Sequence, residues 1–202
     1  MIKIENEDTK GWEHSIRGMR NPMNSWDKSD SWDNNVGKND MELMRKLSQA
    51  STDHRKFMRM IIVYADITAP LYWWKEFDTY KVGTVANSCS TMHKIAAKEF
   101  TLADFSYDHL LPLSKDVFSG IINTLNYYRE QFIVMKNKAF WWQMIQLLPS
   151  SYNQKRTVML NYEVLTNIYK SRKNHKLDEW REFCEWIKSL PYSEIITGEC
   201  EK

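Results

Sequence analysis

The chain has 202 residues, 43% of them hydrophobic, and its 28 basic residues nearly balance its 26 acidic residues. This balance removes the whole-chain electrostatic argument for a nucleic-acid partner. No apolar run approaches the roughly 18 residues that a membrane-spanning helix needs, and Cys89, Cys184 and Cys200 show no metal-ligand spacing. We therefore expect a single reduced, cytoplasmic domain over residues 1–202 that contacts neither membrane nor nucleic acid and has no metal site.

Six glycines and five prolines are too few for a fold with many tight turns, which favours helices. The pattern of the first third predicts a strand over residues 1–10, a helix over 11–20, a loop over 21–39, a helix over 40–50 and a strand over 58–67. Asp40 is the expected N-cap of the second helix. In the polar loop, Trp26 and Trp32 either anchor the loop to the body of the domain or cover a ligand.

The rest of the chain is predicted to be mostly helical. Its expected elements are a short amphipathic helix over 69–81, a segment of small polar residues over 82–93, and helices over 113–138, 139–147, 153–173 and 177–190. The residues of the long helix expected to face the core are Val117, Ile121, Leu125, Tyr128 and Phe132. This order of elements predicts an α+β fold in which helices predominate.

Two segments carry side chains suited to a ligand. Residues 84–93 offer hydroxyl and amide groups with little bulk, which suits close contact with a phosphate or a flat heterocycle. Asn161, Leu165 and Arg172 share one face of the predicted helix 153–173, with Asn167 about 120° away. An amide and a guanidinium there either fix the edge of a planar ligand or are ordinary surface residues.

Other catalytic signals are weak. His54 and His93 are candidate general bases by residue type, but a structural or surface histidine is the more common case. The chain has no Gly-rich phosphate loop and no Gly-x-Ser-x-Gly nucleophile motif. Residue chemistry alone therefore indicates a polar ligand site without naming the reaction.

The two polar segments together resemble the flavin-dependent thymidylate synthases. In that family an Ala-Pro lead precedes the run Arg-Gln-x-x-Arg-His-Arg-x-x-Ser-x-Asn-Glu-x-Ser-x-Arg-Tyr. Here Ala69-Pro70 opens a lead of the same length, Lys75-Glu76 takes the Arg-Gln place, and Thr79-Tyr80-Lys81 takes the Arg-His-Arg place. With one extra residue at Ala86, the remaining matches are Thr84, Asn87 and Ser90, whereas the family's Glu, Arg and Tyr are replaced by Ser88, Met92 and His93.

The second segment resembles the same family in its spacing. Leu148-Pro149 falls at the family's Leu-Pro, and the family's Asn-x-Arg-Ser-Leu-x-Asn stretch and late Arg are matched by Asn161, Leu165, Asn167 and Arg172. Glu163 stands where the family has Arg, and His175 lies near its Ser-His pair. Together the two segments cover somewhat under half of the chain.

The resemblance implies a helix-rich α+β domain with a small antiparallel sheet, in a homotetramer that binds FAD and dUMP at subunit interfaces. Members of the family convert dUMP to dTMP with methylenetetrahydrofolate and with FAD that NADPH has reduced, without an enzyme nucleophile. Arg172 would be the catalytic residue, lying against the uracil and favouring its ionised form. Substrate binding would pass to Lys75, Glu76, Ser88, Ser90, Thr91 and Arg172, and cofactor binding to Thr79, Tyr80, Lys81, Asn161, Asn167 and His175.

Two classes of function follow from the sequence. The first is a flavin-dependent enzyme that methylates or hydroxymethylates a pyrimidine nucleotide. The second is a non-catalytic protein of the same fold that binds a nucleotide or a protein partner, which fits the changed Arg-His-Arg positions and the tryptophans of the polar loop.

Overall fold

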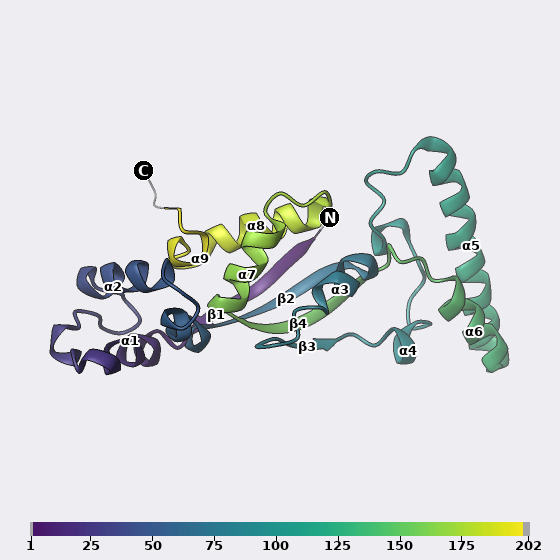
Figure 1. Ribbon diagram of the computed structural model, residues 1–202. Coiled ribbons are helices and arrows are strands. Elements are labelled where there is room, and N and C mark those ends of the chain that lie inside the picture. The colour runs from purple at the N-terminus through teal and green to yellow at the C-terminus, as the bar shows by residue number, and fades with distance from the viewer. Residues whose placement is uncertain (1, 200–202) are drawn as a thin grey trace. The chain divides into compact units, whose positions relative to one another are not determined.

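A computed structural model describes residues 2–199, so that Cys200 lies outside the described residues. The strands are β1 (Lys3–Lys10), β2 (Ile62–Pro70), β3 (Val85–Ser88) and β4 (Asn153–Asn161). The α-helices are α1 (Trp12–Arg20), α2 (Lys38–Ser48), α3 (Leu71–Phe77), α4 (Thr91–Lys94), α5 (Pro112–Met135), α6 (Lys138–Leu147), α7 (Tyr162–Arg172), α8 (Asp178–Ser189) and α9 (Glu194–Thr197) (Figure 1). The expected α+β class with a majority of helix is confirmed.

The four strands form one small sheet in the order β1-β2-β4-β3. Backbone hydrogen bonds at the two ends of the central pair fix its register, because the Leu71 amide donates to Tyr152 and the Tyr162 amide donates to Ile61. These bonds make β2 and β4 antiparallel neighbours. Alternate residues of β2 are buried, as expected for a strand with one face on a core.

Two compact units divide the chain, and every strand contributes residues to both. Unit 1 contains residues 67–79 and 87–156, together with the start of β1. Unit 2 contains residues 4–66, 80–86 and the chain from residue 157 onward.

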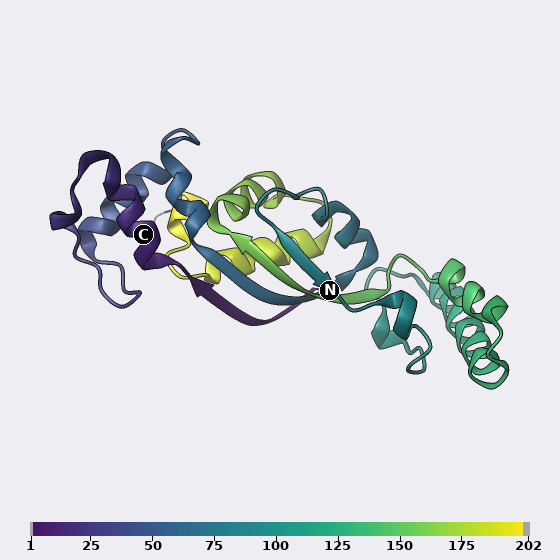
Figure 2. The same cartoon turned by 90° about the horizontal axis from the view of Figure 1, so that it is seen from below.

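In unit 2, the core forms where α7 and α8 lie against one face of the strands (Figure 2). Almost the whole of α7 is buried, and the apolar side of α8 buries Trp180, Phe183 and Ile187. The helix predicted over 177–190 is therefore confirmed as α8, whose hydrophobic spacing matches its buried face. The predicted helix 11–20 is likewise confirmed as α1.

In unit 1, the helices α5 and α6 pack against each other around a hydrophobic cluster that includes Phe105, Phe118, Leu125 and Met144. Both predicted helices are confirmed. Of the five residues expected to face the core from α5, Leu125 is buried and Ile121, Tyr128 and Phe132 pack against the cluster, whereas Val117 is exposed and Phe118 and Ile122 are buried in addition. Within residues 2–199, no helix is both long enough and apolar enough to cross a bilayer.

The prediction of one helix over 153–173 is wrong in its first half. Residues 153–161 form β4, which pairs with β2 on one side and β3 on the other. Helical and strand spacing are hard to separate in such a short apolar run, and pairing on both edges decides it here. The helix begins only at Tyr162, since the Asn161 side chain caps it.

The prediction for Asp40 is also wrong in detail. Asp40 lies one turn inside α2, whose N-cap is Gly37, and its carboxylate is fully buried. The strand expected over 58–67 begins later, at Ile62, because residues 54–60 form a 3₁₀ helix. The polar stretch 21–39 is largely loop, as predicted, with two single 3₁₀ turns.

Candidate functional site

Arg172 closes α7 and lies between two aromatic rings of unit 2. Its guanidinium carbon is 4.7 Å from the centre of the Trp180 ring and 5.8 Å from that of Tyr80, and its Nε donates to the Tyr80 hydroxyl at 3.0 Å. The His175 ring packs edge-on against Trp180. We call Tyr80, Arg172, His175 and Trp180 the Arg172 cluster.

The local sequence explains why the guanidinium is held so firmly. Arg172 sits in the last turn of α7, where a cation is favoured by the helix dipole. Trp180 is completely buried on α8 and so provides a rigid aromatic surface. A guanidinium stacked in this way stays flat and charged, with its N–H groups in a fixed plane, which suits recognition of a planar polar ligand.

Asn161 ties the other end of α7 to the segment that carries Tyr80. Its Oδ1 accepts from the Val164 amide at 2.9 Å and its Nδ2 lies 3.5 Å from the Gly83 carbonyl. Gly83 has a φ of 77°, and a Cβ added there would lie 2.6 Å from Asn161 Nδ2. Beside it, the buried Thr84 hydroxyl has no hydrogen-bond partner among the described residues. Segment 80–86 therefore contacts the start of α7 through Asn161 and its end through Arg172. The Thr84 hydroxyl within it is a hydrogen-bonding group that the described residues leave unpaired.

Glu163 is buried next to this capping residue and pairs with Arg55 at 3.1 Å. The two side chains are only 8% and 7% exposed. Glu163 Oε2 and Arg55 Nε have no partner among the described residues, so the pair is only partly satisfied. The negative charge that stands at the family's Arg position is thus neutralised within unit 2.

The hydroxyl-rich segment lines a cavity of about 320 Å³ in unit 1. Among its lining residues are Ser90, Thr91, Lys94, Lys98, Tyr152 and Lys155. Three ammonium groups and three hydroxyls around one cavity suit an anionic group such as a phosphate. The Ser90 hydroxyl also accepts from the His93 amide at 3.1 Å and so caps α4.

At this cavity Lys98 and its partner Asp104 are held in their charged forms, whereas Tyr152 is held neutral. The hydrogen bond and ion pair with Asp104 raise the pKa of Lys98 above its usual value. Burial acts to raise the pKa of Asp104, but bonds from Lys98 and Thr101 outweigh it and lower the pKa. Burial raises the pKa of Tyr152, so that its phenol stays protonated at neutral pH.

The predicted site residues therefore fall into three sets. The structure brings Tyr80, Arg172 and His175 together, and it joins Asn161 to the segment that contains Lys81. Ser90 and Thr91 line the cavity of unit 1. The third set lies outside both the Arg172 cluster and the lining of the cavity of unit 1. It contains Lys75 and Glu76 on α3, Thr79 just after it, Ser88 on β3, and Asn167 on the exposed side of α7.

Sequence reasoning missed Trp180 and Arg156. Arg156 lies 4.3 Å from the centre of the Trp74 ring and pairs with Asp78 at 2.7 Å. Its Nε also donates to Gln154, two residues earlier on the same face of β4. Strand alternation would have linked these two residues, but the segment was interpreted as helical.

No protein-family model matches the sequence, and no curated protein matches it. Solved structures do match the fold over nearly the whole chain. The flavin-dependent thymidylate synthase ThyX from Helicobacter pylori, complexed with FAD and dUMP, superposes with a TM-score of 0.73 over 98% of both chains at 14% identity. The chain has the fold of the flavin-dependent thymidylate synthases.

A second solved protein with this fold is a methylase of a different name. The UMP/dUMP methylase PolB from Streptomyces cacaoi, bound with 5-Br UMP, matches with a TM-score of 0.67 at 14% identity, over 98% of this chain and 94% of its own. The sequence resemblance rests on two short segments, whereas the similarity in fold covers 98% of this chain. At this identity the comparison concerns the fold, and activity is a separate question.

Proposed function

We propose that this chain binds a pyrimidine nucleotide and methylates or hydroxymethylates it at C5, with dUMP as substrate, methylenetetrahydrofolate as one-carbon donor and FAD reduced by NADPH. The observation that carries the proposal is the fold shared over 98% of the chain with a protein complexed with FAD and dUMP. The Arg172 cluster supports it, because the guanidinium at the end of α7 is held flat on Trp180.

Arg172 is the residue we assign to catalysis. A guanidinium stays charged at any working pH, so it stabilises negative charge that develops on the pyrimidine carbonyls. That charge makes C5 nucleophilic enough to attack a one-carbon unit without a covalent bond to the enzyme. Tyr80 and Trp180 act by fixing the orientation of Arg172, which removes the cost of ordering its long side chain on binding.

The substrate phosphate would lie in the cavity of unit 1, where Ser90 and Thr91 offer hydroxyls. Lys94 and Lys98 supply positive charge at the same cavity. Lysine is a point charge without the planar fork of arginine, so it would hold a phosphate with less geometric selectivity. Lys75, Glu76 and Ser88 are assigned to the nucleotide through the resemblance alone.

The residues of segment 80–86 and the start of α7 fit FAD. Tyr80 offers an aromatic face, Lys81 a cation for the diphosphate, and Thr84 a buried hydroxyl that the protein leaves unbonded. Asn161, Asn167, His175 and Thr79 complete the proposed cofactor set through the resemblance. Reduced FAD would supply the hydride that turns the transferred carbon into a methyl group.

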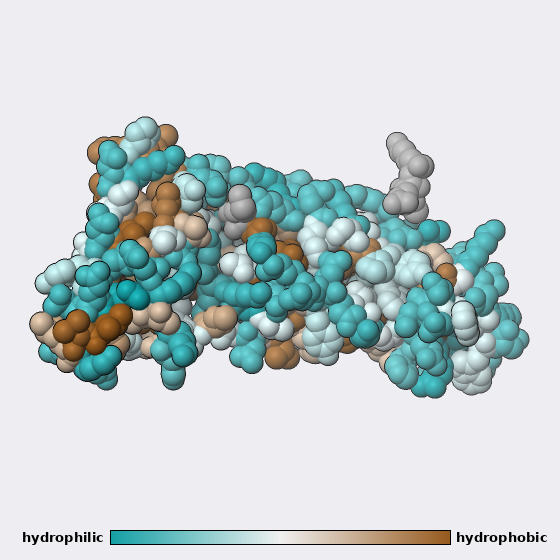
Figure 3. Space-filling view, turned by 180° about the vertical axis from the view of Figure 1, so that it is seen from behind, coloured by the Kyte–Doolittle hydropathy of each residue, from teal (hydrophilic) through white to brown (hydrophobic). Residues whose placement is uncertain are grey.

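We further propose that the working form is a homotetramer. The surface of α5 and α6 exposes apolar side chains, including Leu113, Val134 and Trp142, and apolar atoms gather on this part of the molecule at the left of Figure 3. An exposed apolar surface of this kind is typical of association sites. Contacts between copies would then complete the nucleotide site.

The test of function is a spectrum and an isotope release assay on the purified full-length chain. We expect bound FAD to absorb between about 350 and 500 nm, and tritium to be released from 5-tritiated dUMP when methylenetetrahydrofolate and NADPH are present. Arg172→Ala should abolish release, whereas Lys170→Ala, an exposed cation on the same helix, should leave it unchanged. Release that persists in Arg172→Ala would contradict the assignment of Arg172.

A second candidate function is a nucleotide-binding protein without catalysis. The observation that favours it is the buried Arg55–Glu163 pair, which occupies a position where the resembling family carries a positive charge. Thermal stabilisation by dUMP, with no FAD uptake and no tritium release, would favour this candidate over the enzyme.

A further inference from the structure

A cavity of about 240 Å³ lies between α1 and the loop that follows it, apart from both groups described above. Its lining includes Arg17 and Arg20 of α1, Trp26, and the short hairpin that carries Trp32. All of these residues belong to unit 2. None of them takes part in the proposed methylation.

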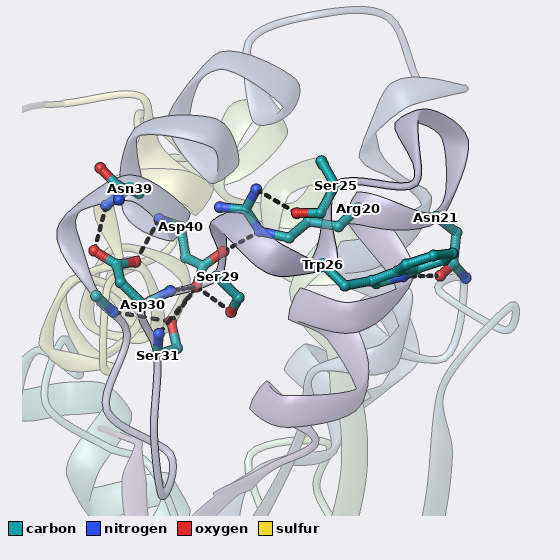
Figure 4. A network of polar contacts seen from close by, with 10 residues as sticks. Arg20, Asn21, Ser25, Trp26, Ser29, Asp30, Ser31, Asn39 and Asp40 are labelled. Carbon is teal, nitrogen blue, oxygen red and sulfur yellow. Dashed lines mark hydrogen bonds and ion pairs between the residues drawn. The ribbon is translucent and has the colours of Figure 1, made fainter.

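The loop around this cavity is held by a buried charge. Asp40 accepts hydrogen bonds from Arg20 Nε at 2.6 Å, from the Ser29 and Ser31 hydroxyls at 2.7 and 2.6 Å, and from the Asp30 and Ser31 amides at 3.1 Å (Figure 4). The Asp40 side chain is completely buried. Charge-assisted hydrogen bonds are among the strongest in proteins, so Asp40 holds the backbone of this loop in a defined conformation.

The same loop exposes the indole side chains of Trp26 and Trp32 to solvent. Trp32 begins a turn over 32–35 whose central residues, Asp33 and Asn34, have φ values of 47° and 64°. Positive φ at both positions is typical of the tight type I′ turn. Trp32 is nonetheless 79% exposed, and Trp26 is 50% exposed. Trp26 donates its indole N–H to Asn21 at 2.9 Å, and a tryptophan side chain has only two χ angles to order when a planar ligand stacks on it.

Two guanidinium groups add hydrogen-bond donors to the cavity. Arg20 donates its Nε to Asp40 and its Nη1 to the Ser25 carbonyl, while its Nη2 has no protein partner among residues 2–199. The Arg20 side chain is only 5% exposed, and the residue lines the cavity. Arg17 also lines the cavity and makes no hydrogen bond or ion pair with another described residue.

The size and charge of the cavity narrow the choice of ligand. Exposed indoles stack on nucleobases with little preference for sequence, and guanidinium groups bind phosphate through paired N–H donors. Glu13 and Asp33 also line the cavity, so a ligand with several negative charges would be repelled. We propose that this cavity is a second nucleotide site, which takes a nucleoside monophosphate by stacking its base on Trp32 and Trp26 and binding its phosphate at Arg17 and Arg20.

Isothermal titration of the full-length chain with AMP tests the proposal, because AMP carries adenine in place of the uracil that the Arg172 cluster would bind. We expect one AMP per chain, with adenosine and inorganic phosphate each binding at least tenfold more weakly. Trp32→Leu and Arg17→Gln should each weaken AMP binding by about tenfold or more, the effect of one lost base stack or one lost charge-assisted bond. The matched controls are Met23→Leu, an exposed apolar residue of the same loop, and Arg59→Gln, an exposed cation, and both should bind AMP normally.

The two nucleotide sites can be told apart in the same titration. AMP affinity that is unchanged in Arg172→Ala supports a separate site, whatever the outcome of the tritium assay. No AMP binding at millimolar concentration, or equal binding in Trp32→Leu, Arg17→Gln and the unmodified chain, overturns the proposal. Equal binding of adenosine and AMP overturns it as well, because the guanidinium groups would then contribute nothing.

Discussion

Asp40 shows how much structure one buried carboxylate can organise. It neutralises Arg20 and accepts from three residues of the loop that follows α1. Burial acts to raise the pKa of Asp40, but hydrogen bonds from Ser31, Ser29 and Arg20 outweigh it and hold the pKa below its usual value. The ionised form is therefore the one that the fold requires.

Asp40→Asn should lower the free energy of unfolding by about 3 kcal/mol at neutral pH, because Arg20 is left as a buried charge without its partner. The contribution of Asp40 is complete above about pH 4, the pKa in an unfolded chain, and is lost as pH falls through the lower pKa of the folded state. Urea unfolding at pH 7 and pH 3 should show the difference between the two proteins shrinking in acid. Asp27→Asn, a change at an exposed carboxylate of the same loop, is the control.

A second substitution, Arg172→Lys, tests whether the charge of Arg172 is sufficient without its contacts to Trp180 and Tyr80. Arg172→Lys keeps the positive charge but loses the flat stack on Trp180 and the fork that reaches Tyr80. We expect tritium release from dUMP to fall by about tenfold or more, in line with the roughly 1.5–3 kcal/mol of a charge-assisted hydrogen bond. Full activity in Arg172→Lys would mean that charge alone matters, and that the aromatic platform does not orient the group.

At the scale of elements, Gly83 connects a loop to a helix start. Its positive φ and its close approach to Asn161 leave no room for a Cβ. Gly83→Ala should cost about 1–2 kcal/mol from backbone strain alone and should weaken FAD binding, because the cap of α7 and segment 80–86 must both shift. Thermal melting and an FAD titration measure the two effects.

Gly120 provides the opposite case on α5. A Cβ added there meets nothing within 4 Å. Gly120→Ala should therefore stabilise the chain by about 1 kcal/mol, since alanine is the better helix former. If Gly83→Ala stabilised the chain as Gly120→Ala should, the geometry assigned to Gly83 would be wrong.

Elements with a clear amphipathic period could be predicted from the sequence. For α1, α5, α6 and α8 the spacing of apolar residues indicated both the type of element and its approximate ends. The error at β4 arose because the apolar residues Val158 and Leu160 of the strand run directly into the start of α7, with no glycine or proline to mark the boundary. Only pairing with β2 and β3, contacts far away in sequence, separates the strand from the helix.

The candidate site was predictable in part for the same reason. Asn161 could be selected because its amide lies between apolar residues, and Arg172 because its place matches the late Arg of the resembling family. Trp180 could not, since a buried indole on an amphipathic helix looks like ordinary core until its contact with Arg172 is seen. The buried charge of Glu163 also gave no sign in the sequence of its distant partner Arg55.

At the scale of the whole molecule, the exposed apolar side chains of α5 make a prediction about assembly. Val134 is 77% exposed on this helix. Val134→Glu should shift the chain from tetramer toward smaller species in analytical ultracentrifugation, because a carboxylate would be buried at the interface without a partner. Met23→Glu, at an exposed apolar residue of unit 2, should leave the distribution unchanged.

Asn161 has one further consequence, which concerns how genetic variation in this protein should be interpreted. The same amide starts α7 and contacts the segment assigned to the cofactor. A mutational screen scored on growth or turnover would rank Asn161 as intolerant of substitution. It would not show whether the capping of α7 or the contact with segment 80–86 had been lost. Asn167 is solvent-facing on the same helix and caps nothing, so variants there would report on ligand contact alone.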